Sequence, residues 1–246
     1  MGKAYWLERG ALIEGALEDA FPFLVDGQGH VVALVGGGGK TTLMFALARA
    51  FARRGLRTAV TTTTRIFKPA DSSACDSLAR CRARWDRGEY AVWGRDLESG
   101  KLGALSEEEL SALLEGADVT LVEADGARRM ALKAPAEHEP VIPDEADIVV
   151  GVAGLDVLGK SVAQACFRPE LVAALLGCDT GHALTGEDIA KVLRSAFGAR
   201  KGVGERAFYA VLNKADDASR RAQGAHVLRL LGENAVMTYF SEKERA

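Results

Sequence analysis

A run of glycines followed by a lysine and two threonines stands between a strand-like apolar run and an alanine-rich helical pattern. These residues are Gly36, Gly37, Gly38, Gly39, Lys40, Thr41 and Thr42. Because glycine has no side chain, backbone N–H groups can turn toward an anion, and a helix N-terminus adds partial positive charge. We therefore expect a phosphate-binding loop, in which Lys40 reaches the β- and γ-phosphates and Thr41 completes a Mg²⁺ shell.

The loop departs from known phosphate-loop patterns at two positions. The pattern G-x-x-x-x-G-K-[ST] has a glycine six residues before the lysine, where this chain has Leu34. The loop is more similar to the K-G-G-x-G-K-T-T of maturation and partition ATPases and GTPases, but Val35 replaces the first lysine. A mechanism that uses this lysine between subunits is therefore not expected. The alternative is a flexible glycine hinge, which does not require Lys-Thr-Thr at this place.

Two carboxylates follow another apolar run, Val119–Val122. Glu123 and Asp125 are two residues apart, so the period of a strand gives them the same face. In an open α/β sheet, ligands lie outside the carboxyl ends of the strands, so these acids would face the glycine loop and hold Mg²⁺. Asp125 is the first choice as metal ligand and Glu123 the second. An acidic turn without a ligand is the alternative.

A third motif follows the run Phe208–Leu212. Asn213, Lys214 and Asp216 form the N-K-x-D signature of guanine-nucleotide-binding proteins, in which the aspartate accepts hydrogen bonds from guanine N1–H and its exocyclic amine. Adenine cannot supply these donors, so the motif favours GTP over ATP. Ser241 stands where such proteins place the loop that backs the base.

Further polar residues belong to the same expected edge. Arg65 follows four threonines, Thr61–Thr64, and would neutralise charge that develops in phosphoryl transfer. His138 lies on a proline-stiffened loop between Lys133 and Glu139, where it could act as an acid or base. The alternatives are a threonine-rich strand end and a solvated loop histidine.

The elements that must position these motifs alternate along the chain. Helical patterns, among them 41–54, a short helix opened by a capping box at 106–109, and 217–231, separate six apolar, β-branched runs. Because these runs lack polar alternation, helices should cover both faces of a mostly parallel sheet. We predict an α/β fold, a three-layer α/β/α sandwich of the P-loop NTPase type. The predicted strands are His30–Val35, Thr58–Thr63, Val119–Glu123, Ile148–Val152, Phe208–Asn213 and Ala235–Tyr239.

Composition narrows the class of protein. The chain has 246 residues, 48% of them hydrophobic, and a formal net charge of −3, which is typical of a folded globular protein and argues against nucleic-acid binding. We expect one domain over 1–246, with an insertion-like region at about 67–105. Charged residues near the N-terminus argue against a signal peptide, and apolar stretches are too short to span a membrane. A cytoplasmic location is the prediction, and the oligomeric state stays open.

Four segments, VGGGGKTT, TTTTRIFKP, LVEADGARRMALKAPAEHEPVIP and VLNKAD, together resemble the bacterial selenium cofactor biosynthesis protein YqeC family. The resemblance spans nearly the whole chain, and its most specific part is 123–143. It implies an accessory factor for selenium-dependent molybdenum hydroxylases or their cofactor, with such a hydroxylase or a cofactor precursor as partner.

The motifs and the resemblance predict a Mg²⁺-dependent P-loop protein that binds GTP, or ATP, and hydrolyses it slowly. Two alternatives remain open. One is a small-molecule kinase or nucleotidyltransferase, in which the loop from Lys133 to Glu139 binds an acceptor. The other is a nucleotide-gated chaperone that hydrolyses almost nothing alone.

Overall fold

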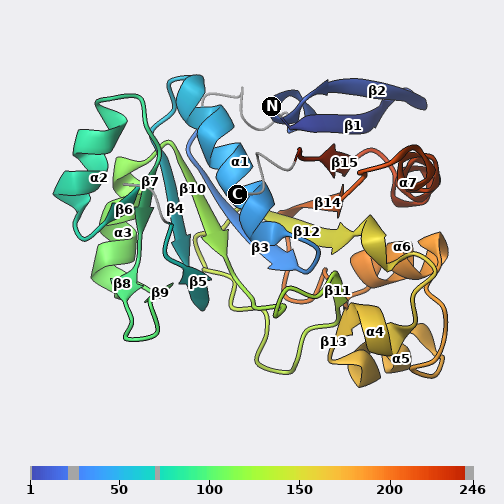
Figure 1. Cartoon of the computed structure of the whole chain (residues 1–246). Helices are drawn as coiled ribbons and strands as arrows, with labels where there is room; N and C mark the ends of the chain where they lie inside the picture. Colours follow the sequence, from blue (N-terminus) through green and yellow to red (C-terminus); the bar gives the residue numbers. More distant parts are fainter. Residues whose placement is uncertain (1, 22–27, 70–72, 242–246) are drawn as a thin grey trace.

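One large sheet organises the chain in the computed structural model, which describes residues 2–21, 28–69 and 73–241. Among these residues, ten strands pair in the order β2-β1-β15-β14-β12-β3-β10-β4-β7-β6 (Figure 1). All neighbours from β15 to β6 are parallel, whereas β1 is antiparallel to both β15 and β2. The strands are β1 (Lys3–Glu8), β2 (Ala11–Ala16), β3 (His30–Gly36), β4 (Thr58–Thr62), β6 (Ala74–Cys75), β7 (Ala91–Trp93), β10 (Val119–Glu123), β12 (Ile148–Gly154), β14 (Ala207–Asn213) and β15 (Ala235–Tyr239).

Strand β3 shows why these runs are apolar throughout. Val32 and Leu34 pack into one hydrophobic cluster together with helix α1 (Lys40–Arg53), while Ala33 and Val35 pack into a second cluster on the opposite face. A strand that is buried on both faces needs apolar residues at every position. The predicted α/β class with a large, mostly parallel sheet is confirmed, and the arrangement agrees with a three-layer sandwich.

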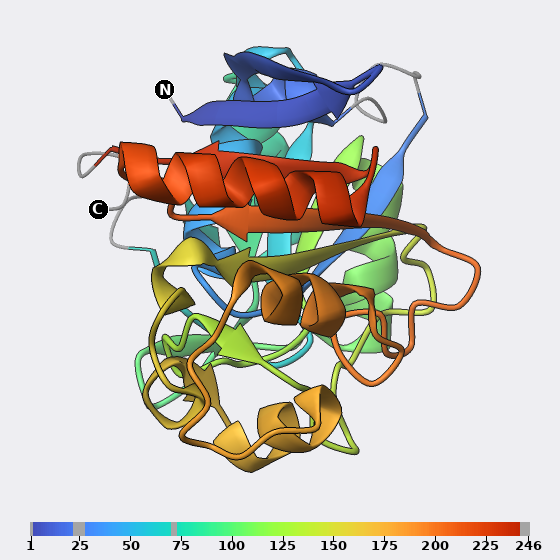
Figure 2. The same cartoon turned by 90° about the vertical axis from the view of Figure 1, so that its right-hand side faces the viewer.

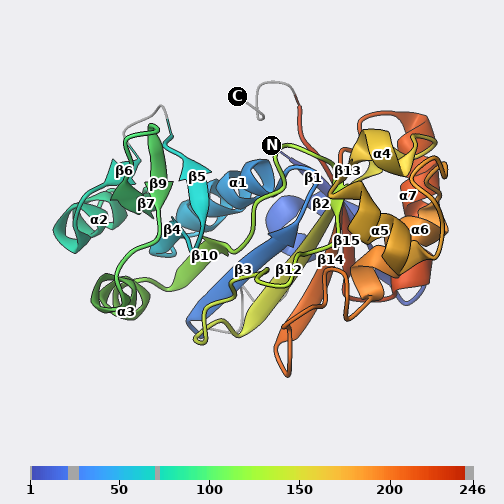
Figure 3. The same ribbon diagram turned by 90° about the horizontal axis from the view of Figure 1, so that it is seen from below.

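The remaining helices gather at the two ends of the sheet. Helices α2 and α3 lie at one end, and α4 to α7 at the other (Figures 1 and 3), with α7 packed along the side that faces the viewer in Figure 2. Capping boxes at Ser106 and Thr185 begin α3 and α6, and Asp217 caps α7. No helix in the described ranges combines the length and the apolar character that crossing a bilayer demands. The bounds are α2 (Leu78–Trp85), α3 (Glu107–Gly116), α4 (Val162–Ala165), α5 (Pro169–Leu176), α6 (Gly186–Arg194) and α7 (Ala218–Leu231), with 3-10 turns η1 (Leu17–Ala20) and η3 (Leu155–Val157).

The N-terminal hairpin β1–β2 was not expected from the sequence. Its two-residue turn, Arg9-Gly10, has positive φ at both positions (50° and 82°), as a turn matched to strand twist requires. The sequence Arg-Gly lacks the Asn-Gly or Asp-Gly signal of such turns, and arginine rarely adopts this conformation. The sequence pattern therefore did not predict the antiparallel strands β1 and β2 at this edge of the sheet.

The stretch from 67 to 105 departs from the alternation because its strands are very short. Strands β6 and β7, joined by α2, extend the main sheet beyond β4. Strands β5 (Arg65–Phe67), β9 (Lys101–Gly103) and β8 (Arg95–Asp96) form a separate small antiparallel sheet. Another small sheet pairs β11 (Leu132–Lys133) with β13 (Cys166–Phe167). Both small sheets contribute residues to the cavity described next.

Candidate functional site

The glycine loop joins β3 to α1 at the carboxyl edge of the sheet. Gly36, Gly38 and Gly39 have φ values of 97°, 76° and 104°, a left-handed region that favours glycine. A Cβ added to Gly38 would lie 2.1 Å from the backbone nitrogen of Gly154, at the end of β12. Glycine at position 38 is therefore required both by backbone conformation and by the close approach of the neighbouring strand.

Three of the glycine N–H groups are used inside the protein, that of Gly36 by the Asp125 carboxylate. The N–H of Gly37 donates to the Val152 carbonyl (2.8 Å), and that of Gly38 donates to the Met130 carbonyl (3.0 Å). This differs from the expectation that successive glycine N–H groups all face an anion. The first turn of α1 is the better anion site, because the leading N–H groups of a helix have no intrahelical partner.

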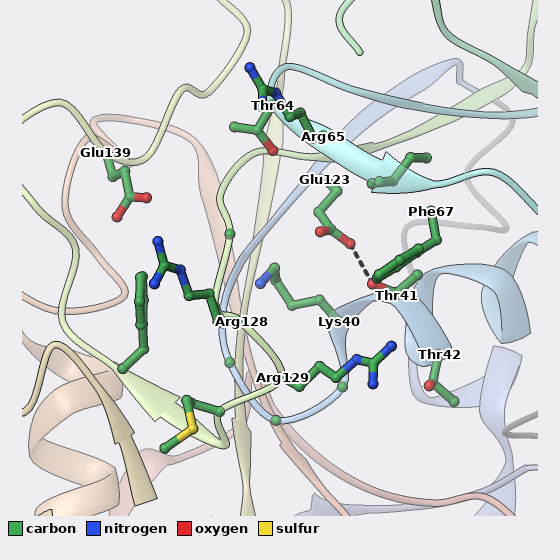
Figure 4. Close-up of a pocket in the computed structure, with 18 of the residues that line it drawn as sticks. Lys40, Thr41, Thr42, Thr64, Arg65, Phe67, Glu123, Arg128, Arg129 and Glu139 are labelled. Atoms are coloured by element: carbon green, nitrogen blue, oxygen red, sulfur yellow. Dashed lines mark hydrogen bonds between the residues drawn. The ribbon is translucent and has the colours of Figure 1, made fainter. Parts of the chain in front are cut away.

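Lys40 begins α1 and is almost fully buried. Its Nζ donates to the Gly36 carbonyl (2.6 Å) and lies 3.0 Å from Oδ1 of Asp125. The side chain also lines a large cavity at this edge (Figure 4). The lysine is thus held across its own loop, with its charge next to the cavity.

Asp125 lies behind the glycine loop. Its side chain is 2% exposed, its Oδ2 accepts the Gly36 N–H (3.0 Å), and the same oxygen lies 3.1 Å from Nζ of Lys133. Two lysines and a backbone N–H therefore surround this carboxylate, and it does not line the cavity. The arrangement favours Glu123 over Asp125 as a metal ligand, because Asp125 has lysine partners and lies outside the cavity.

Glu123, the second choice, occupies the position expected of the first. It ends β10, lines the cavity, and accepts a hydrogen bond from Oγ1 of Thr41 (2.7 Å; Figure 4). Burial raises the pKa of Glu123, although nearby Lys40 and the Thr41 hydroxyl oppose that rise. The described residues contain no group of three or more His, Cys, Asp or Glu side chains able to hold a metal. Mg²⁺ bound with a nucleotide needs fewer protein ligands, since phosphates and waters fill its shell.

A buried row of alternating charges continues from Asp125. Lys133 lies 2.8 Å from Oε2 of Glu139, and Glu139 in turn pairs with Arg168, which precedes α5. Burial raises the pKa of Glu139, but hydrogen bonds from Arg168 and Lys133 outweigh it and bring the pKa to about 2. We call Lys40, Asp125, Lys133, Glu139 and Arg168 the charge row. The Lys133 side chain is fully buried within the charge row, so it does not face the space where an acceptor substrate would bind.

The cavity itself has a volume of about 920 Å³, at the upper end of the range for small-molecule sites. Seven lysine and arginine side chains line it against two glutamates, in a chain whose net charge is negative. Such an excess of positive charge in a concave site favours an anionic ligand. The seven are Lys40, Arg65, Lys101, Arg128, Arg129, Arg168 and Lys214.

Four of these cations have a left-handed backbone. Among the described non-glycine residues, Arg9, Arg128, Arg129, Arg168 and Lys214 have positive φ, and all except Arg9 line the cavity. This conformation is costly for a residue with a Cβ and persists only where the surrounding structure imposes it. Backbone strain is therefore concentrated at the cationic wall of the cavity.

Four of the lining cations lie over the rings of two phenylalanines. Lys101 and Arg129 lie over Phe67, at 4.8 and 5.4 Å from the ring centroid. Phe167, on β13, has Arg168 at 4.5 Å and Arg128 at 5.5 Å. These contacts orient long basic side chains without neutralising them. Figure 4 labels Phe67, Arg128 and Arg129 among the side chains that line the cavity.

The N-K-x-D segment also contacts the glycine loop, through Asn213. Nδ2 of Asn213 donates to the Gly38 carbonyl (2.9 Å), while its Oδ1 accepts the Lys214 N–H and the Thr238 hydroxyl. Lys214 lines the cavity and pairs with Asp156 (2.8 Å). The asparagine therefore fixes the loop, and the lysine reaches the site.

Other predicted residues are divided between the cavity and its surroundings. Thr42, Arg65 and His138 line the cavity, as does Thr64. Within the described chain, neither Asp216 nor Ser241 lines it; the Asp216 carboxylate accepts a hydrogen bond from Arg220. The hydroxyls of Thr62 and Thr63 donate instead to the carbonyls of Glu123 and Val141.

Sequence reasoning missed several residues of the basic wall, namely Phe67, Lys101, Arg128, Arg129, Phe167 and Arg168. The pair Arg128-Arg129 follows the predicted acids closely and offered a usable signal. Phe167 and Arg168 lie in a stretch without a recognised motif, and only the pairing of β13 with β11 brings them to the site.

The fold and the site define an α/β protein with a basic cavity at the carboxyl edge of a mostly parallel sheet. A family model, described as YqeC protein, matches residues 32–170. The chain is also 32% identical over 191 residues to Uncharacterized protein YqeC of Escherichia coli (strain K12), covering 70% of this chain and 71% of that protein. The chain belongs to the YqeC family. The segment that matches the family model contains the glycine loop, Glu123 and the whole charge row, whereas Asn213 to Asp216 lie beyond it.

Proposed function

We propose that this protein is a P-loop protein that binds a nucleoside triphosphate together with Mg²⁺ at the glycine loop. The observation that carries the proposal is the hydrogen bond from Thr41 to Glu123 (2.7 Å), next to Lys40 at the N-terminus of α1. It brings together an amine, a hydroxyl and a carboxylate, which are the three groups that a Mg²⁺-bound triphosphate requires. The excess of basic side chains around the cavity supports the same ligand class.

Thr41 and Glu123 fit the metal by their chemistry, since Mg²⁺ prefers oxygen ligands and the two oxygens already face one cavity. When bound, Mg²⁺ supplies positive charge that offsets the phosphate oxygens. Lys40 binds the β- and γ-phosphates, and the first-turn N–H groups of α1 hold the remaining phosphate oxygens. Asp125 keeps Lys40 and Gly36 in register behind the loop.

GTP is the nucleotide we propose, with ATP as the competitor. The contact of Asn213 with Gly38 supports the role of the N-K-x-D segment, because it couples that segment to the phosphate loop. In this proposal Lys214 packs along the nucleotide, Asp216 accepts from guanine and Ser241 backs the base. Base choice would then follow from the hydrogen bonds that guanine can donate to Asp216 and adenine cannot.

Hydrolysis or transfer would use two other residues that line the cavity. Arg65 offsets charge at the γ-phosphate, and His138, exposed on the loop after β11, is the acid or base closest in sequence to the charge row. We further propose that nucleotide binding, in the cytosol, drives the maturation of selenium-dependent molybdenum hydroxylases or of their cofactor. What supports this role is the resemblance of the four sequence segments to the selenium cofactor biosynthesis protein YqeC family, whereas the comparisons establish the family assignment alone.

Calorimetric titration of the full chain with GTPγS and ATPγS, each with and without Mg²⁺, tests the proposal. We expect Mg²⁺-dependent binding that is tighter for GTPγS, and loss of tight binding in Lys40→Ala, which deletes the charge at the phosphates. Arg82→Ala, an exposed arginine on α2 away from the cavity, is the matched control and should bind as wild type. Wild-type affinity in Lys40→Ala would refute the phosphate-loop assignment.

A second candidate is a small-molecule kinase or nucleotidyltransferase. The observation that favours it is the extent of the cavity, which continues past the glycine loop to Phe167 and Arg168 on β13 and the turn before α5. A hydrolase that works on water alone does not need this basic extension. Nucleotide turnover that depends on an added acceptor would support transfer over hydrolysis.

A further inference from the structure

The extension of the cavity toward Phe167 and Arg168 has the features of a separate anion-binding site. We infer that it binds a second anionic group, carried by a small phosphate-bearing molecule, at Arg128 and Arg168 while a triphosphate occupies the loop at Lys40. The inference rests on the proposed function and deepens it, because it names the class of the second ligand. We call the surface of Arg128, Arg168 and Phe167 the arginine pole.

The charge row gives the cavity two cationic ends. Lys40 stands at one end, beside the glycine loop, and Arg168 at the other, while Asp125 and Lys133 between them are essentially inaccessible. Each link is a direct ion pair, so the positions of the two terminal cations are tied to each other. Both terminal side chains line the same cavity. A single buried network therefore positions two separate anion-binding groups.

Arg128 gives the arginine pole a positive charge that Glu139 does not neutralise. Glu139 partly neutralises Arg168, but Arg128 has no carboxylate partner among the residues that the structure describes. It is exposed, has a left-handed backbone (φ 45°), and lies over the ring of Phe167. The ring holds the guanidinium in place while leaving its N–H donors available, as recognition of a phosphate by arginine requires.

The charge balance argues that one nucleotide does not use the whole basic wall. The lining cations exceed the lining glutamates by five, from seven against two, and the charged residues paired with them behind the lining, Lys133 against Asp125 and Asp156, lower this excess to four. A Mg²⁺-bound triphosphate carries about two negative charges, because the metal cancels about half of its charge. The excess positive charge that remains suits a second group with more than one negative charge, which a phosphate provides and a single carboxylate does not.

The test follows arginine side chains directly. The probe is inorganic phosphate, titrated into the full chain saturated with Mg²⁺ and GTPγS, with the Nε–Hε resonances of Arg128 and Arg168 observed by NMR. We expect both resonances to shift with one common Kd. Arg128→Ala should raise this Kd about tenfold, the usual effect of losing a charge-assisted contact, and change the Kd of GTPγS less than about threefold. Arg82→Ala is again the control and should change neither constant.

The outcomes separate the inference from the proposed function. Phosphate that shifts Arg128 and Arg168 only in the free protein, and is displaced by GTPγS, would overturn the inference and assign both arginines to the nucleotide. Unshifted resonances, or an unchanged phosphate Kd in Arg128→Ala, would overturn it as well. Failure of GTPγS to bind would refute the proposed function by itself, because phosphate binding at the arginine pole is read from its own resonances in the free protein.

Discussion

Asp125 and Lys133 form an ion pair at 3.1 Å between side chains that are 2% and 0% exposed. The aspartate follows β10, and the lysine lies on β11, a strand of the second small sheet. Because Asp125 also contacts Lys40 and the Gly36 N–H, this pair joins the glycine loop to the arginine pole. The loop and the pole therefore depend on one buried carboxylate.

The roles of the two acids after Val122 can be separated by amide substitutions. Asp125→Asn should lower the free energy of unfolding by about 3–5 kcal/mol, because it leaves two buried lysines without their shared anion. Glu123→Gln should leave stability unchanged or increase it, since burial raises the pKa of Glu123 and so disfavours its charged form. Urea unfolding measures both changes.

The same two variants should also differ in how strongly Mg²⁺ enhances the binding of GTPγS. Glu123→Gln retains an oxygen that accepts from Thr41 but loses the negative charge, so Mg²⁺ should no longer enhance GTPγS binding appreciably. A strongly destabilised Glu123→Gln, or an Asp125→Asn protein as stable as wild type, would contradict the assignment of Glu123 to the cavity and Asp125 to the core.

The sequence predicts where Glu123 and Asp125 lie, but it does not predict their different roles. Strands such as β10 and β14 are predictable because burial on both faces requires mostly apolar residues, which the sequence displays directly. The motifs at their ends follow, since parallel strands present them at one edge. The partner of a carboxylate is a different matter. Lys133 and Arg168 reach Asp125 and Glu139 through irregular loops and two-residue strands, which carry no periodicity to read.

Asn213 is expected to stabilise the fold and to support nucleotide binding regardless of the base. Asn213→Ala removes the hydrogen bond to the Gly38 carbonyl and two that its Oδ1 accepts, all at a buried position. We expect a loss of about 2–4 kcal/mol of stability, because buried partners are left unsatisfied. The affinities for GTPγS and ATPγS should fall by similar factors. Thermal unfolding and calorimetry check the two parts, with the exposed Asn234→Ala as control.

Asp216 is expected to act on base choice alone. Its carboxylate is partly exposed and bonded to Arg220, so Asp216→Asn should change stability by less than about 1 kcal/mol. Because an amide can donate where a carboxylate can only accept, the variant should bind GTP more weakly and xanthosine triphosphate more tightly than wild type. Competition titrations with GTP, ATP and xanthosine triphosphate measure the change. An unaltered order of the three affinities would show that the N-K-x-D segment does not select guanine.

Glu139 should give the protein a measurable acid sensitivity. Its pKa is lowered to about 2 in the folded chain from an ordinary value of 4.5, since Arg168 and Lys133 favour the carboxylate more than burial opposes it. A group with a lowered pKa stabilises the fold above its unfolded pKa and loses that contribution as pH falls toward its folded pKa. The stability that Glu139 contributes should therefore be complete above about pH 4.5 and disappear toward about pH 2.

Glu139→Gln tests this by comparison with wild type across that pH range. The difference in unfolding free energy between the two proteins should be about 2–3 kcal/mol near neutral pH and shrink steadily below about pH 4.5. Denaturant titrations at intervals of pH measure it. Glu137→Gln, which removes an exposed carboxylate two residues away on the same loop, should differ from wild type by less than about 0.5 kcal/mol throughout. A difference for Glu139→Gln that stays constant from pH 7 to pH 3 would mean that the pairing with Arg168 and Lys133 does not depend on the charge of this carboxylate.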